Sequence, residues 1–160
     1  MFLSEILHPV HPQKFREEIL GKRYYYWRAP VGATDRYQSL YSWQRFEDYL
    51  NDWRNANHVQ LAAMTSEGKP KHGHKWDKGK DGTLSKSDVY NYWRHGHSIV
   101  IPFCEFQSQE LWTVNNTIER AMPFGRGCAN MYCSSRQGAK TFEPHRDSTE
   151  NFLFHIDGQV

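Results

Sequence analysis

The residues with the clearest chemical potential lie near the end of the chain, in the stretch from Glu143 to Gly158. His145 and Asp147 are two positions apart, so on an extended segment their side chains point to the same face, with Cα atoms roughly 6–7 Å apart. An imidazole nitrogen and a carboxylate oxygen at this spacing can bind one cation with bonds of about 2 Å. The stretch is therefore predicted to be a metal-binding strand.

The His-x-acid pattern is weak evidence by itself. With nine His and eighteen Asp plus Glu in 160 residues, chance yields about one such pair. A second pair is present at His155 and Asp157, but the Asp-Gly dipeptide at its end is typical of a turn. The first pair follows Pro144, which places His145 at the start of its strand, where a site at the mouth of a barrel requires it.

Length and composition are those of one domain, and the net charge is only +2. This charge does not require a polyanionic partner, so nucleic-acid binding is not expected. Residues 1–10 lack the pattern of a signal peptide, and no apolar run is long enough to cross a membrane. Cys104, Cys128 and Cys133 are odd in number and lack Cys-x-x-Cys spacing. This number and spacing of cysteines argue against a disulfide framework or a zinc knuckle, and they favour a reducing, cytoplasmic setting.

The elements that must position the candidate site are predicted from caps, breakers and periodicity. Helices are expected from Pro12 to Gly21, from Ser42 through Leu50, from Ser85 to Gly96 and from Leu111 to Met122. Strands are expected at 58–64, 98–101, 128–134 and from Lys140 into His145. Helices come first and strands gather late. This order predicts an α+β chain in which residues 1–125 are helix-rich and residues 126–160 begin a barrel.

Two other stretches have the composition of binding segments. Lys22–Arg28 contains four consecutive aromatic residues, and it is either a substrate platform or, as we favour, a strand whose rings pack on the core. Ser66–Gly82 contains five lysines. It is either a grip for phosphates or an acidic peptide or, as we favour, a solvated loop. His72 and His74 lie in this loop without further metal ligands at a convincing spacing.

A resemblance to a known family rests on motifs in a fixed order: Asn130-Met131-Tyr132, then Pro144-His145-Arg146-Asp147, then Asn151-Phe152-Leu153-Phe154 and Gly158. They resemble the JmjC or cupin-like family of iron(II)- and 2-oxoglutarate-dependent dioxygenases, in particular its asparaginyl hydroxylases and ribosomal oxygenases. The resemblance implies one cupin-like JmjC domain over residues 1–160 with a double-stranded β-helix (jelly roll). It implies two iron ligands, His145 and Asp147, and three residues of the 2-oxoglutarate pocket, Asn130, Tyr132 and Asn151. Glu143 and Arg146 would frame the mouth of the site.

Three positions differ from the family pattern. The family's second His ligand lies several strands beyond the first pair, whereas thirteen residues follow Asp147. His155 lies roughly 33 Å further along an extended chain and is expected in the core or at the rim. Val160 stands in place of the basic residue that anchors the co-substrate, and Phe142 in place of a small hydroxyl residue. We therefore expect the N-terminal portion of a longer protein, with a truncated barrel.

The predicted function is an Fe(II)- and 2-oxoglutarate-dependent oxygenase, most simply a hydroxylase of a protein side chain or a small molecule. The alternative is a non-catalytic cupin-like module, or an inactive fragment, that binds a partner through its aromatic N-terminal part and its Lys-rich loop. A membrane partner is not expected. A homodimer is compatible with the sequence, because open strand edges favour association.

Overall fold

The computed structural model describes residues 2–28, 37–52, 58–64, 70–71, 84–123, 125–135, 142 and 144–158. The chain divides into two compact units, each built from separate stretches of sequence. Unit 1 comprises Met1–Tyr41, Glu105–Gly127 and Asp147–Gly158, and unit 2 comprises Ser42–Cys104, Cys128–Arg146 and Gln159–Val160. The predicted α+β class is confirmed, since the described residues form five α-helices and a small open antiparallel sheet. They do not form the predicted barrel.

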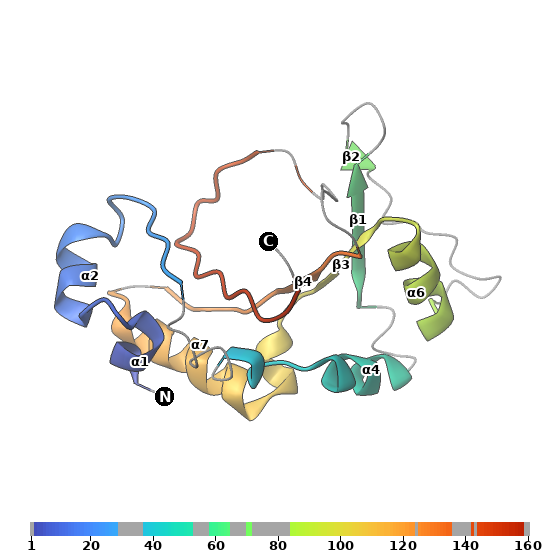
Figure 1. The fold of residues 1–160 in the computed structure, drawn as a ribbon, viewed down its shortest axis with the longest axis horizontal. Helices are drawn as coiled ribbons and strands as arrows, with labels where there is room; N and C mark the ends of the chain where they lie inside the picture. The colour runs from blue at the N-terminus through green and yellow to red at the C-terminus, as the bar shows by residue number, and fades with distance from the viewer. Residues whose placement is uncertain are drawn as a thin grey trace. The chain divides into compact units, whose positions relative to one another are not determined.

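Unit 1 contains the helices α1 (Leu3–Leu7), α2 (Pro12–Glu18) and α7 (Gln109–Ala121), and α1 contacts both of the others (Figure 1). Pro12 occupies the first turn of α2, as predicted. Helix α1 was not predicted, because it is only five residues long and its N-cap residue Phe2 has no side-chain cap hydrogen bond. A helix this short is stable only through tertiary packing, and its Ile6 and Leu7 side chains are fully buried.

Two apolar clusters form the core of unit 1. The first is centred on Leu7, Val10, Phe15 and Ile19, and the second on Ile6, Leu40 and Val114. The predicted apolar face of α7 is confirmed in part, because Leu111 and Ile118 pack with Val114 while Met122 packs against the first cluster. Helix α7 begins at its N-cap Ser108, whose hydroxyl accepts a hydrogen bond from the Leu111 amide at 3.2 Å.

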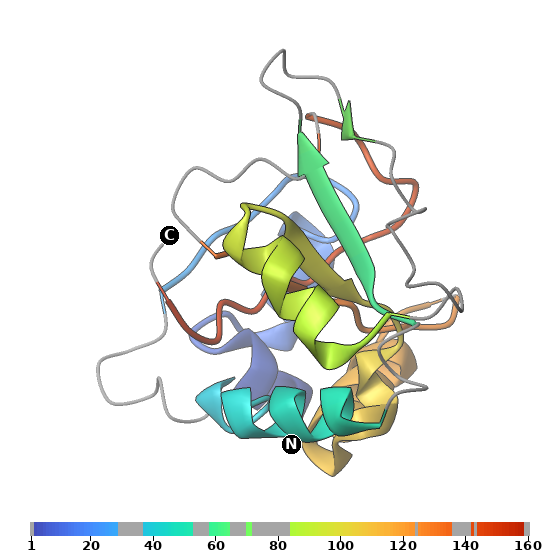
Figure 2. The same ribbon diagram turned by 90° about the vertical axis from the view of Figure 1, so that its right-hand side faces the viewer.

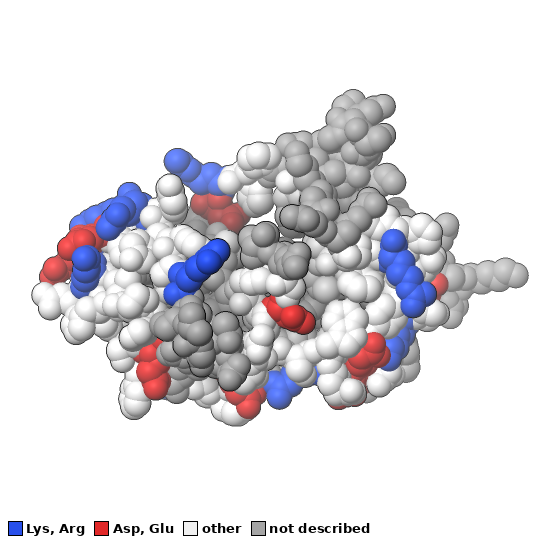
Figure 3. Space-filling view, in the orientation of Figure 1, with Lys and Arg blue, Asp and Glu red and all other residues white. Residues whose placement is uncertain are grey.

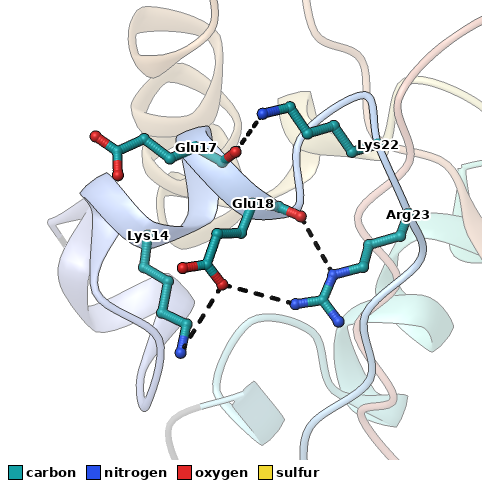
Figure 4. Close-up of polar contacts among 5 residues, drawn as sticks. All are labelled: Lys14, Glu17, Glu18, Lys22 and Arg23. Atoms are coloured by element: carbon teal, nitrogen blue, oxygen red, sulfur yellow. Dashed lines mark hydrogen bonds and ion pairs between the residues drawn. The ribbon is translucent and has the colours of Figure 1, made fainter.

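Basic side chains close the C-terminal end of α2 (Figure 4). Lys22 Nζ donates a hydrogen bond to the Glu17 carbonyl, and Arg23 Nε donates to the Glu18 carbonyl at 3.2 Å. The Glu18 carboxylate also lies 3.9 Å from Arg23 and 4.0 Å from Lys14. Cations are favourable at this end of a helix because its last carbonyl groups lack intrahelical partners. The contacts fix the direction in which the chain leaves α2.

The aromatic segment after α2 does not pack as we expected. Residues 23–28 are not part of a strand, and Tyr24 and Tyr26 are 95% and 76% exposed. Only Trp27 packs against the core, with Tyr25 beside it at a ring separation of 5.4 Å. The prediction that these rings pack on the core is therefore wrong for the tyrosines. Aromatic composition indicates an extended segment but does not say which rings a neighbouring element covers.

Gly127 is held by two side chains of α7. Asn115 Nδ2 donates to the Gly127 carbonyl at 3.1 Å, and the Gly127 amide donates to Glu119 Oε2 at 3.2 Å. A Cβ atom at residue 127 would lie 2.6 Å from Asn115 Oδ1. The break that the sequence predicted after this helix is thus fixed by a close approach of backbone and side chain.

Gly127→Ala should therefore lower the free energy of unfolding by about 0.5–1.5 kcal/mol, because the Asn115 side chain must move and lose its hydrogen bond. Urea unfolding followed by circular dichroism measures the change. The matched control is the same substitution in an Asn115→Ala background, where the close contact no longer exists. An equal loss in both backgrounds would contradict this explanation.

Unit 2 contains the sheet, in the strand order β2-β1-β3-β4 (Figure 1). The strands are β1 (Gln60–Met64), β2 (Pro70–Lys71), β3 (Ser98–Ile101) and β4 (Met131–Cys133). All the pairs are antiparallel, and the central strand β3 places Ile99 between Leu61 and Cys133. The strand at 98–101 is confirmed and those at 58–64 and 128–134 are shorter than predicted. The two-residue β2 lies inside the predicted lysine loop, the rest of which is almost wholly outside the described residues.

Helices α4 (Trp43–Asn51) and α6 (Lys86–Arg94) complete unit 2, and α6 lies against β1 and β3 (Figure 2). The predicted N-caps are confirmed: Ser42 accepts from the Arg45 amide at 3.1 Å, and Ser85 forms a capping box with Asp88. Among the described residues, no helix is long and apolar enough to cross a membrane.

A polar network joins α4 to α6. Lys86 Nζ and the Tyr90 hydroxyl both donate to the Glu47 carboxylate, and Lys86 Nζ also donates to Asn51 Oδ1 at 2.9 Å. The hydrogen bonds from Lys86 and Tyr90 lower the pKa of the Glu47 carboxyl. Burial, together with the hydrogen bond to Glu47, raises the pKa of Tyr90. The network thus depends on an ionised Glu47.

The lowered pKa of Glu47 predicts a pH-dependent effect of Glu47→Gln. A carboxyl whose pKa is lower in the folded state stabilises the protein above its unfolded pKa, near 4.5. This stabilisation disappears as the pH falls through the folded-state pKa. Wild type should therefore melt at a higher temperature than Glu47→Gln at pH 7, and the gap should close towards pH 3. A gap independent of pH would show that Glu47 acts without its charge.

The terminal segment Asp147–Gly158, which bends at residues 148–149 and 157–158, is not the strand that the sequence predicted. Phe152, Phe154 and Ile156 are half-buried and pack against the core of unit 1, whereas Leu153 is 90% exposed. The alternation is that of a strand. Within the described part of the chain, however, the backbone of residues 150–156 makes no hydrogen bonds. The segment therefore has the side-chain pattern of a strand without a paired neighbour.

Candidate metal-binding and co-substrate site

His145 lies at the end of a row of three aromatic rings in unit 2. The Phe142 ring meets the His145 imidazole edge-on at 5.8 Å, and the Tyr132 ring meets Phe142 edge-on at 6.2 Å. Tyr132 and Phe142 are about half exposed, and His145 is exposed. Edge-to-face contacts of this kind are favourable because the positive edge of one ring faces the negative face of the next. Phe142 thus links the predicted metal ligand to a predicted co-substrate residue.

The ring contact between Phe142 and His145 was not predicted, because Phe142 stood out in the sequence only as a departure from the family pattern. Two features of the sequence could have predicted the contact: Phe142 lies three residues before His145, and it is aromatic, as Tyr132 is. Strand β4 fixes Tyr132, because its backbone pairs with Val100 of the central strand. The imidazole of His145 is therefore supported by a side chain that rests on the sheet.

Asp147 is held by a neighbour in the sequence. Asn151 Nδ2 donates a hydrogen bond to Asp147 Oδ2 at 2.5 Å, and both side chains are exposed. Asn151 immediately precedes Phe152, whose ring packs on Phe15 of α2 at 5.7 Å. The carboxylate is thus tied, through Asn151, to a residue anchored in the core of unit 1.

Asn130, a predicted residue of the co-substrate pocket, contacts the turn at Phe103. Its Oδ1 accepts a hydrogen bond from the Phe103 amide at 3.4 Å, and the Cys104 amide donates to the Ala129 carbonyl at 2.8 Å. Phe103 has a φ of 56°, in the left-handed region that non-glycine residues rarely adopt. Asn130 therefore supports a strained turn just before η1 (Cys104–Gln107).

The structure describes only some of the other residues that the sequence singled out as possible site residues. Arg146 and His155 are exposed, so His155 is a surface residue, whereas Glu143 lies outside the described residues. His72, His74 and the lysines at 69, 75, 78 and 80 also lie outside them. On the face shown in Figure 3, the described acidic and basic side chains are interspersed, without a patch of one sign.

The donor chemistry of His145 and Asp147 fits two positions of a site for a divalent first-row metal, because imidazole and carboxylate are the ligands of the two-His, one-carboxylate iron site. The hydrogen bond from Asn151 is the outer support that metal-binding carboxylates commonly have. Among the described residues, no three His, Cys, Asp or Glu side chains are grouped so that they could hold a metal ion. The described chain thus supplies two candidate ligands without a third.

The structure defines a mixed α+β chain that carries two candidate metal ligands, His145 and Asp147. Comparison with known proteins adds an informative match. No family model and no solved structure matches the chain. It is similar to the bifunctional lysine-specific demethylase and histidyl-hydroxylase NO66 of Branchiostoma floridae, with 26% identity over 159 residues. The match covers 96% of this chain and 24% of the relative. The resemblance to JmjC enzymes is therefore supported as a distant and partial similarity.

Proposed function

We propose that the chain is part of a JmjC-type Fe(II)- and 2-oxoglutarate-dependent oxygenase, and that it acts as a hydroxylase on a protein side chain or a small molecule. The observation that carries the proposal is the similarity over almost the whole chain to a demethylase and histidyl-hydroxylase. Because the chain spans 24% of that relative, the proposal concerns an activity to which these residues contribute.

In this proposal His145 and Asp147 are two of the three iron ligands, and the third is not among the described residues. Tyr132 and Asn130 contribute to the co-substrate pocket. When bound, iron and 2-oxoglutarate would supply the oxidising chemistry that hydroxylates a C–H bond. The chain's own residues orient the ligands: Phe142 rests against the His145 imidazole, and Asn151 bonds to the Asp147 carboxylate.

The proposed function also includes an interpretation of the open sheet in unit 2. Strands β1, β3 and β4 are taken as part of a double-stranded β-helix whose other strands are not among the described residues.

The experiment that tests the proposal is an anaerobic titration of the protein with Fe(II) and 2-oxoglutarate. We expect the visible charge-transfer band of the iron–2-oxoglutarate chelate, followed by succinate formation when oxygen is admitted. The band should be absent in Asp147→Ala and retained in Asp157→Ala, which removes the acid of the second His-x-acid pair. If neither the band nor succinate appears with wild type, these 160 residues do not form a working site.

The second candidate function is a non-catalytic binding module, and the exposed tyrosines favour it. Tyr24 and Tyr26 present large aromatic surfaces beside Lys22 and Arg23, a combination that is common where proteins bind partners. A binding module would form no succinate. Tyr24→Ser and Tyr26→Ser would then weaken partner binding, whereas in the oxygenase proposal they should leave iron binding unchanged.

A further inference from the structure

We infer that Asn151 is a positioning residue for Asp147, which holds the carboxylate ready for a metal ion, and not primarily a residue of the co-substrate pocket. The inference rests on the proposed function, because it takes Asp147 as a metal ligand. It comes from the hydrogen bond between Asn151 Nδ2 and Asp147 Oδ2, 2.5 Å long. The sequence resemblance gave Asn151 a different role.

The chemistry of this contact suits an outer partner of a ligand. An ionised carboxylate has about four acceptor positions, so it can accept one N–H and still bind a metal ion. The neutral amide adds no charge that would compete with the cation. An exposed Asp side chain that is free to rotate must be ordered when it binds, and a pre-formed hydrogen bond lowers that cost.

The position of Asn151 in unit 1 explains why it can do this. Residues 148 and 149 form a bend that brings Asn151 back to Asp147, four positions earlier. The next residue, Phe152, packs on Phe15 and on the apolar cluster of α1 and α2. The amide therefore projects from a backbone that is anchored by a half-buried aromatic ring, so its direction is defined by the core.

The test measures Mn(II) affinity by the loss of the free-ion EPR signal, using the full chain. Asn151→Ala should bind Mn(II) about 10–100-fold more weakly than wild type, the usual effect of removing an outer partner of a metal ligand. Thr149→Ala, in the same exposed bend, is the matched control and should bind as wild type does. In an Asp147→Ala background, Asn151→Ala should cause no further loss.

A second measurement separates positioning from co-substrate binding. At saturating Mn(II), the affinity of Asn151→Ala for 2-oxoglutarate should equal that of wild type. A fall in 2-oxoglutarate affinity with unchanged Mn(II) affinity would overturn the inference and return Asn151 to the co-substrate pocket. Additive losses in the double variant would also overturn it, since they would indicate general disruption of the segment. If Asp147→Ala alone leaves Mn(II) affinity unchanged, the proposed function itself fails.

Discussion

His145→Ala should weaken Mn(II) binding by at least about 100-fold, because loss of a direct ligand should exceed the 10–100-fold typical of an outer partner. The imidazole has no substitute in its immediate surroundings within the described chain: its ring neighbour is Phe142, and no further group of ligands is present there. The same EPR assay on the full chain measures the loss. This is the largest effect on binding that the proposed function predicts.

His155→Ala is the matched control for this substitution. His155 is exposed and lies ten positions after His145. It is also the His of the second His-x-acid pair, with Asp157. We expect its replacement to leave Mn(II) affinity unchanged, because His155 is not a ligand in the proposed site. Equal losses for the two variants would mean that the protein binds Mn(II) through scattered surface histidines, which would contradict the assignment of His145.

Phe46→Ala should lower the free energy of unfolding by about 3–5 kcal/mol, the range for removing a large aromatic side chain from a core. Phe46 is only 1% exposed and lies between Trp43, at a ring separation of 5.1 Å, and Tyr90, at 6.2 Å. The substitution removes the ring contact of Phe46 with Tyr90, whereas Trp43 keeps its contacts with Tyr90 and Trp93 of α6. Urea unfolding monitored by tryptophan fluorescence measures the change.

Gln44→Ala, on the exposed face of the same helix, is the control for Phe46→Ala. Gln44 Nε2 donates a hydrogen bond to Asp48 Oδ1 at 2.9 Å on the surface, so the expected change in the free energy of unfolding is within about 0.5 kcal/mol. A loss below 1 kcal/mol for Phe46→Ala would show that the aromatic cluster is loosely packed and that the network of Glu47, Lys86 and Tyr90 holds α4 to α6.

The sequence by itself determined the elements whose signals are local. Ser42, Ser85 and Ser108 cap their helices through hydrogen bonds to amides three residues on, and such bonds depend only on neighbouring residues. The apolar run at 98–101 forms the central strand because β-branched residues suit a fully buried strand.

Only the tertiary structure decided the features that depend on distant partners. The strand order, the burial of α1 and the exposure of Tyr24 and Tyr26 follow from which elements cover which surfaces, and periodicity carries no information about that choice. The same holds for the candidate site. Sequence spacing selected His145 and Asp147, but it did not show that Phe142 and Asn151, three and four residues away, contact them, because those contacts depend on how the folded chain orients the side chains.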